Sequence, residues 1–154
     1  MKRFLIPLVL VLALALPGQA LAGTKSFSGA IDPSGTVSFK VKKKHGKKKV
    51  TGLKFNQVPI TCDGGASTTG ADVGNAGRLK HKKFGFSGSN PSGTATLDAV
   101  GKVTGSSASG AVQIQGDVLL SDGSTGTNCD TGALGWTAAK GKIAPASPTR
   151  APVF

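Results

Sequence analysis

Basic side chains gather in two short runs of the sequence, and they are the groups whose type and spacing could form a binding site. The candidate residues are Lys42, Lys43, Lys44, Lys47, Lys48, Lys49, Arg78, Lys80, Lys82 and Lys83. No acidic residue lies between Pro33 and Cys62, so the first run predicts a strongly positive surface. Such a surface would dock an anionic polysaccharide or another cell-envelope polymer. It would bind nucleic acid only non-specifically, because no aromatic residue lies among the lysines to stack on bases.

The same lysines also have a purely structural interpretation. Lysines on exposed strands discourage sheet edges from pairing between molecules, and a net charge of +12 keeps a protein soluble. The sequence therefore leaves two functions open, polymer docking and a purely structural extracellular module.

Groups that act as acids, bases or nucleophiles are scarce in this chain. All 7 acidic residues are aspartates, and the 2 histidines each stand among lysines. His45 and His81 are these two residues, and two histidines fall short of the three or four ligands of a zinc site. We therefore expect no enzymatic activity, no cofactor and no metal site.

Asp63 and Asp130 provide the remaining chemical alternative. Each directly follows a cysteine, so a bridge between Cys62 and Cys129 would bring the two carboxylates into one neighbourhood. Paired carboxylates suit cleavage of a glycosidic bond or binding of Ca²⁺. The alternative function is therefore a carbohydrate-binding or carbohydrate-cleaving domain, although Asp near Gly more commonly closes a turn through its own backbone.

The first residues of the chain have the pattern of a secretory signal peptide. Two basic residues precede an apolar run over residues 4–16, and small residues at 20 and 22 provide a cleavage site before Gly23. The run is shorter than the roughly 20 residues that cross a bilayer. We therefore expect residues 1–22 to be removed, leaving an extracellular protein with no transmembrane segment.

Export makes the two cysteines informative. In an oxidising compartment an isolated pair most simply forms one bridge, so the sequence predicts a disulfide between Cys62 and Cys129. Free or metal-binding thiols are the alternative, which is disfavoured because neither cysteine lies in a C-x-x-C pair or near a histidine.

Short stretches of alternating apolar residues predict the elements that must position these groups. They are Val37, Phe39 and Val41; Leu53 and Phe55; Phe84 and Phe86; Val112 and Ile114; and Leu134, Trp136 and Ala138. Clusters of turn-forming residues separate them about every ten residues. This pattern predicts an all-β domain over residues 23–140, with a jelly-roll or Ig-like antiparallel two-sheet β-sandwich and one inter-strand disulfide. The proline-rich residues 141–154 predict an extended C-terminal tail.

Two parts of the sequence echo each other. FSG at 27–29 and PSGT at 33–36 recur as FSG at 86–88 and PSGT at 91–94, and each set is followed by a Cys-Asp pair. A duplicated half would explain this order, and chance in a chain rich in Gly, Ser and Thr would explain it about as well.

The order of these motifs also carries a resemblance. FSG, a Lys-rich hairpin, VPITCDGG, FGFSG and NCDTGALGWTA together resemble a set of uncharacterised secreted bacterial β-sandwich proteins with a CDGG and CDTGxxxWxA pattern. The similarity covers most of residues 24–140 and implies a fold and an extracellular location, without any catalytic residue. Independently, Trp136 lies seven residues after Cys129, and a packing of its ring against the disulfide is expected.

Overall fold

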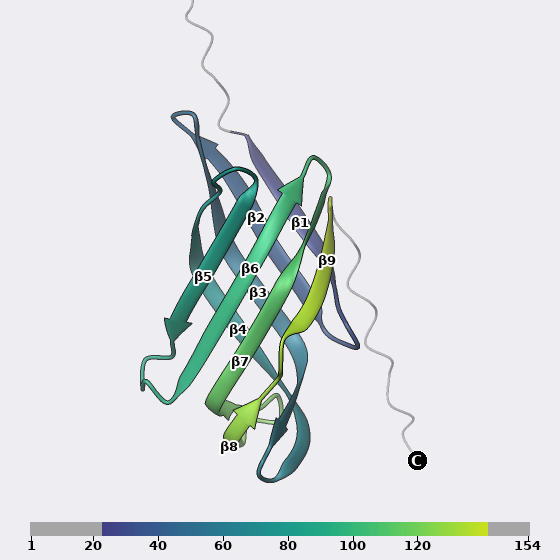
Figure 1. Ribbon diagram of the computed structural model, residues 1–154, viewed down its shortest axis with the longest axis vertical. Helices are drawn as coiled ribbons and strands as arrows, with labels where there is room; N and C mark the ends of the chain where they lie inside the picture. The colour runs from purple at the N-terminus through teal and green to yellow at the C-terminus, as the bar shows by residue number, and fades with distance from the viewer. Residues whose placement is uncertain (1–22, 142–154) are drawn as a thin grey trace, which may run out of the picture.

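Nine antiparallel β-strands form residues 23–141, the part of the chain that the computed structural model describes (Figure 1). They are β1 (Thr24–Ile31), β2 (Thr36–Lys44), β3 (Lys47–Cys62), β4 (Gly65–Arg78), β5 (Lys83–Ser89), β6 (Ala95–Thr104), β7 (Ser107–Leu119), β8 (Thr125–Asp130) and β9 (Leu134–Lys140). The predicted signal peptide and residues 142–154 of the predicted tail lie outside the described residues. None of the described residues forms a helix with the length and apolar character that crossing a membrane requires.

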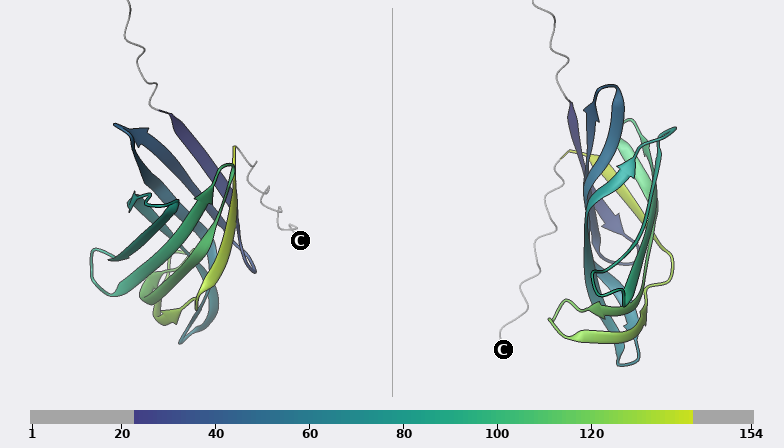
Figure 2. Two further views of the ribbon diagram at one scale, coloured as in Figure 1. Left: turned by 45° about the horizontal axis from the view of Figure 1, so that its top comes forward. Right: turned by 90° about the vertical axis from the view of Figure 1, so that its left-hand side faces the viewer.

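All nine strands belong to one sheet, in the order β4-β3-β2-β1-β9-β7-β6-β5, with β8 pairing β3 and β7. The all-β antiparallel prediction is confirmed, whereas the prediction of two separate sheets is wrong. Strand β9 pairs β1 on one side and β7 on the other, and this joins the two halves. Alternation and turn spacing are the same in both architectures, so they do not encode this long-range pairing. Figure 2 shows the sheet folded over, with strands of the two halves facing each other.

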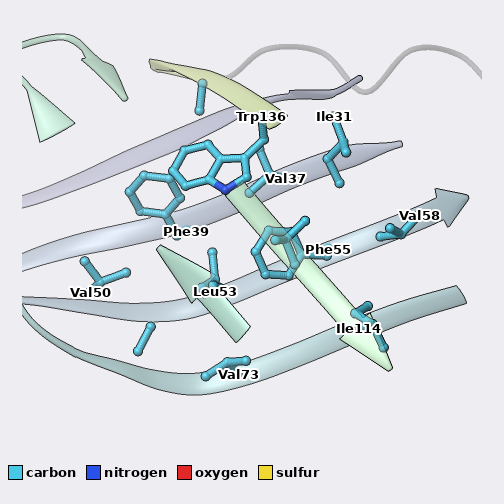
Figure 3. Packing of buried hydrophobic residues seen from close by; sticks show 14 of the residues in the cluster. Ile31, Val37, Phe39, Val50, Leu53, Phe55, Val58, Val73, Ile114 and Trp136 are labelled. Atoms are coloured by element: carbon cyan, nitrogen blue, oxygen red, sulfur yellow. The ribbon is translucent and has the colours of Figure 1, made fainter. Parts of the chain in front are cut away.

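The core lies between these facing halves and is built from every second residue of most strands (Figure 3). Phe39 of β2 is 2% exposed and contacts rings from three other strands. Its ring centroid lies 5.0 Å from Phe27, 5.7 Å from Phe84 and 5.9 Å from Trp136. The expected neighbour of Trp136 was the disulfide, but its ring contacts are with Phe39 and Phe84 instead. The indole Nε1 is buried without a hydrogen-bond partner among the described residues.

The echo in the sequence corresponds to equivalent hairpins only in part. The turn after β1 contains Pro33 and a cis peptide bond before it, and the turn after β5 contains Pro91. Both turns contain a glycine with positive φ, 109° at Gly35 and 73° at Gly93. The two cysteines are not equivalent, because Cys62 ends β3 and Cys129 lies in β8.

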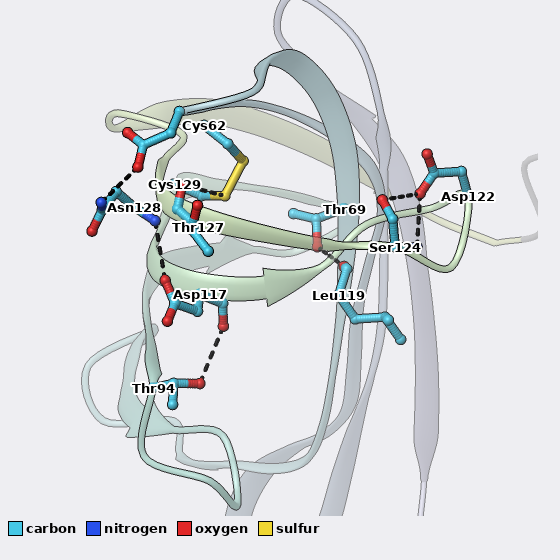
Figure 4. The surroundings of a disulfide bond; sticks show 11 residues. Cys62, Thr69, Thr94, Asp117, Leu119, Asp122, Ser124, Thr127, Asn128 and Cys129 are labelled. Carbon is cyan, nitrogen blue, oxygen red and sulfur yellow. Dashed lines mark hydrogen bonds between the residues drawn. A yellow bond between two sulfur atoms is a disulfide. The ribbon is translucent and has the colours of Figure 1, made fainter.

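The ring of strands closes at both ends and is open in the middle, between β4 and β5. At one end the chain itself passes from β4 to β5 through residues 79–82. There the Leu79 amide donates to the Lys48 carbonyl (2.9 Å), which extends the β3–β4 pairing, and the Val103 amide donates to the Lys82 carbonyl (2.8 Å), which extends the β5–β6 pairing. At the other end the buried Thr69 Oγ1 donates to the Leu119 carbonyl (2.7 Å; Figure 4). No ladder joins β4 to β5 along the described strands, so these two strands are the free edges of the sheet.

The predicted disulfide between Cys62 and Cys129 is confirmed (Figure 4). It joins β3 to β8 at the same end as Thr69, and the Asp63 amide donates to the Thr127 carbonyl beside it (3.1 Å). A single Thr61–Asp130 pair is the whole ladder between these two strands. The disulfide therefore reinforces a short contact between the first and the second half of the chain.

Candidate functional site

The fold brings both lysine runs to one end of the molecule, drawn uppermost in Figure 1. The first run forms the β2–β3 hairpin and the second forms the end of β4 and the turn into β5. Lys49 pairs with Arg78 across β3 and β4, and Lys83 pairs with Lys102 across β5 and β6. We call this surface the lysine end, and all ten predicted residues belong to it.

Three further lysines, which sequence analysis did not single out, lie at the same end. Lys25 lies opposite Val41 in β1, and Lys102 and Lys140 lie near the ends of β6 and β9. The position of Lys25 could have been predicted from the sequence. Counting residues outward from the turn between β1 and β2 places Lys25 beside the first lysine run. Lys140 depends on the pairing of β9, which no local pattern predicts.

Strand alternation divides the lysines of the β2–β3 hairpin between the two faces of the sheet. Val41 and Val50 are paired and buried, at 5% and 0% exposure. Lys43 and Lys48 form the pair two residues further along each strand, so they continue the inward-facing column. Lys42 pairs with Lys49 in between, and the alternation directs this pair outward.

Inward-facing lysines surround a cavity of about 380 Å³ at the lysine end. Its four basic residues come from three different parts of the fold: Lys25, Lys43, Lys48 and Lys82. Beneath them lie apolar side chains, namely Phe27, Val41, Leu79 and Val103. Three of these four are at most 8% exposed, and Leu79 is partly buried. The cavity therefore combines a cationic rim with an apolar floor, and we call it the mouth cavity.

A second hollow, of about 490 Å³, lies on the outward face of β1 to β3. Its basic residues are Lys40, Lys42 and Lys54, accompanied by Ser26, Ser38 and Thr51. Lys54 forms a 2.7 Å ion pair with Asp72, and both side chains are more than half exposed. Hydroxyl groups thus accompany the lysines of this hollow, whereas no hydroxyl side chain lines the mouth cavity.

Like charges face each other repeatedly in the β2–β3 hairpin. The three consecutive cross-strand pairs are Lys42–Lys49, Lys43–Lys48 and Lys44–Lys47. Like charges directly opposite each other destabilise a sheet. Within residues 23–141 the one ion pair within 4 Å is Lys54–Asp72, so no carboxylate offsets the repulsion in these three pairs.

Acidic residues gather at the opposite end of the molecule. Five of the aspartates lie in or beside its turns: Asp32, Asp63, Asp117, Asp122 and Asp130. No basic residue lies in the described turns of that end. The protein is therefore strongly dipolar, and its field directs an anion to the lysine end.

The protection of sheet edges does not account for the hairpin lysines. Strands β2 and β3 each have paired neighbours on both sides, and the free edges belong to β4 and β5. Those edges flank a largely apolar cavity of about 330 Å³, whose one charged lining residue is Asp72. The first lysine run thus lies away from the edges that such lysines would protect.

The aspartates of the alternative site have structural partners. Asp63 accepts a hydrogen bond from Asn128 Nδ2 (2.7 Å). Asp130 accepts from Gln115 Nε2 (3.0 Å), the Gly132 amide (2.7 Å) and Gln113 Nε2 (3.2 Å), and these bonds hold the pKa of its carboxyl below the ordinary value. A lowered pKa suits a fixed turn carboxylate better than a general acid.

The histidines occupy exposed turns, where both have positive φ, 49° at His45 and 47° at His81. Among the described residues no three His, Cys, Asp or Glu side chains gather closely enough to hold a metal ion. Both histidines therefore adopt the left-handed backbone conformation, which is uncommon for residues other than glycine.

Comparison with known proteins finds no matching family model, no significantly similar curated protein and no significantly similar solved structure. The resemblance to secreted β-sandwich proteins therefore stays a prediction, and the functional proposal rests on the geometry of the lysine end.

Proposed function

We propose that this protein is a secreted, non-catalytic binding protein that docks anionic cell-envelope polymers on its lysine end. The observation that carries the proposal is the ladder of three Lys–Lys pairs in the β2–β3 hairpin, which has no neighbouring carboxylate. Repulsion of this kind lowers stability, and a bound polyanion relieves it. The disulfide is compatible with an extracellular setting.

The outward face offers the surface for a long ligand. Lys42, Lys44, Lys47 and Lys49 form the outward and turn positions of the hairpin, and Lys40 continues the same face. The adjacent hollow supplies hydroxyl groups that hydrogen-bond sugar or phosphate oxygens. A polymer lying along this face makes several weak, salt-sensitive contacts rather than one deep contact.

Heparin serves as a defined polyanion to test the proposal, with neutral dextran as the comparison. We expect heparin to bind the wild-type protein at low salt and to lose most of its affinity at high salt, while dextran does not bind. Changing Lys42, Lys44, Lys47 and Lys49 to Gln should remove most heparin affinity. The matched control changes the same four residues to Arg, which keeps the charge and should retain binding.

The two variants also separate the proposal from its alternatives. Equal heparin affinity of the Gln and Arg variants, or binding that salt does not weaken, would contradict docking on the lysine end. Binding of neutral dextran that disappears in Asp63→Asn or Asp130→Asn would favour the carbohydrate-binding alternative. Absence of any binding would leave the lysines a structural role.

A further inference from the structure

We infer that the mouth cavity binds a small amphiphilic anion, a phosphate monoester carried on an apolar chain. The inference rests on the proposed function, because the mouth cavity lies within the lysine end. It goes further by assigning the inward-facing lysines a ligand different from that of the outward ones.

The rim of the cavity provides the anion-binding groups. Lys25, Lys43 and Lys48 each lie two residues from a buried residue of the same strand, so each continues an inward-facing column. Lys82 lines the cavity from the turn between β4 and β5. Four ammonium groups around one opening suit a doubly charged phosphate, and the described residues place no carboxylate on this cavity.

The floor of the cavity provides the apolar contact. Phe27 is 1% exposed, Val41 5% and Val103 8%, and Leu79 closes the side next to the β4–β5 turn. A free phosphate gains nothing from these side chains, whereas an alkyl chain gains about 25 cal/mol for each Å² that it buries. The volume of about 380 Å³ lies in the range of small-molecule sites, which excludes the body of a polymer.

The repulsion between like charges on the rim also favours an anionic ligand. Lys43 and Lys48 repel each other directly across β2 and β3. Both lysines are exposed, and both line the cavity whose floor is apolar. An anion between them removes the repulsion, and its apolar chain covers the floor.

Octyl phosphate is the probe, with inorganic phosphate and octyltrimethylammonium as comparisons, all below micelle-forming concentrations in titration calorimetry. We expect octyl phosphate to bind the wild-type protein about tenfold or more tightly than inorganic phosphate, because of the buried chain. The cationic amphiphile should not bind. Leu79→Asn should weaken octyl phosphate binding and leave inorganic phosphate binding unchanged.

The matched pair of variants is Lys43→Gln with Lys48→Gln against Lys42→Gln with Lys49→Gln. Both remove two charges from adjacent rows of the same hairpin. The inward variant should lose about tenfold or more of the octyl phosphate affinity, and the outward variant less than about threefold. If the inward variant unfolds, Lys25→Gln with Lys82→Gln makes the same test on other strands.

The outcomes distinguish this inference from the proposed function. Equal losses in the inward and outward variants would overturn it, and so would octyl phosphate that binds no more tightly than inorganic phosphate. Neither result would contradict the polymer proposal, which the salt dependence of heparin binding tests separately. Failure of heparin binding with intact, cavity-dependent octyl phosphate binding would overturn only the polymer proposal.

Discussion

Lys43 and Lys48 lie directly opposite each other on β2 and β3, one inward-facing position beyond the buried pair Val41–Val50. The same two columns of side chains thus pass from core to cationic rim within two residues. Repulsion between paired ammonium groups opposes the closure of the hairpin. Nothing else in the sheet requires positive charge at these two positions, which is why we assign them to a ligand.

The first prediction concerns stability without ligand. Lys43→Gln should raise the free energy of unfolding at low salt by about 0.2–1 kcal/mol, because it removes one like-charge pair. The gain should shrink in 1 M salt, where the screening length falls to about 3 Å. Urea unfolding at the two salt concentrations measures both effects.

Lys43→Arg is the control for this prediction, because it keeps the charge and should give no comparable gain. A loss of stability in Lys43→Gln that is equal at low and high salt would show that packing of the lysine stem outweighs its charge.

Sequence alternation was sufficient to predict the buried side of β2. Val37, Phe39 and Val41 were expected in the core and are at most 5% exposed. Extending the same alternation by one step would also have placed Lys43 on the inward face. The rim of the mouth cavity was therefore partly predictable, because the two-residue period of a strand continues past its last buried residue.

The closure of the sheet was not predictable in the same way. Ile31 pairs with Trp136 across β1 and β9, which are far apart in the sequence. Local alternation sets which face of a strand is buried but does not specify a distant partner. For that reason the strands could be predicted, whereas their arrangement as one sheet and the position of Lys140 beside the lysine runs could not.

The second prediction concerns the space beneath the indole ring of Trp136. Gly110 of β7 pairs with Gly101 on one side and with Trp136 on the other. A Cβ at Gly110 would overlap the Val100 carbonyl oxygen and the indole ring. Gly110→Ala should therefore lower the free energy of unfolding by about 1–3 kcal/mol, as overpacking of a core does.

Gly74→Ala is the matched control, because a Cβ there meets no atom within 4 Å and Gly74 is also in a strand. Its stability should stay within about 0.5 kcal/mol of wild type. The melting temperatures of the two variants, measured by thermal unfolding, test this prediction. Similar melting temperatures would show that the backbone and the indole ring of Trp136 shift at little cost to accommodate the added methyl group.

The third prediction concerns the disulfide. Replacing Cys62 and Cys129 together by Ala should lower the free energy of unfolding by about 4 kcal/mol, since the bridge closes a loop of 67 residues. Urea unfolding of the variant should match that of reduced wild-type protein. Coincidence of the variant with oxidised wild type would show that the backbone contacts near Thr61 are sufficient to hold β3 against β8.

The last prediction concerns pH and the hydrogen bonds of Asp130. Gln115, the Gly132 amide and Gln113 donate to its carboxylate, in that order of effect, and hold its pKa below the ordinary value of 3.8. The charged form is favoured by folding, so the stabilisation is present above that value and is lost as pH falls through the lowered pKa. Asp130→Asn should therefore be less stable than wild type at pH 7, and the difference should narrow below pH 3.8.

Gln115→Ala separates this charge effect from the shape of the turn. Removing the strongest donor should shift the Asp130 pKa upward toward its ordinary value, which titration of the carboxyl carbon by NMR measures directly. The backbone bond from Gly132 stays in place, so the turn itself should keep its conformation. A stability difference between wild type and Asp130→Asn that stays constant down to pH 2 would assign the effect to turn geometry rather than to the charge of Asp130.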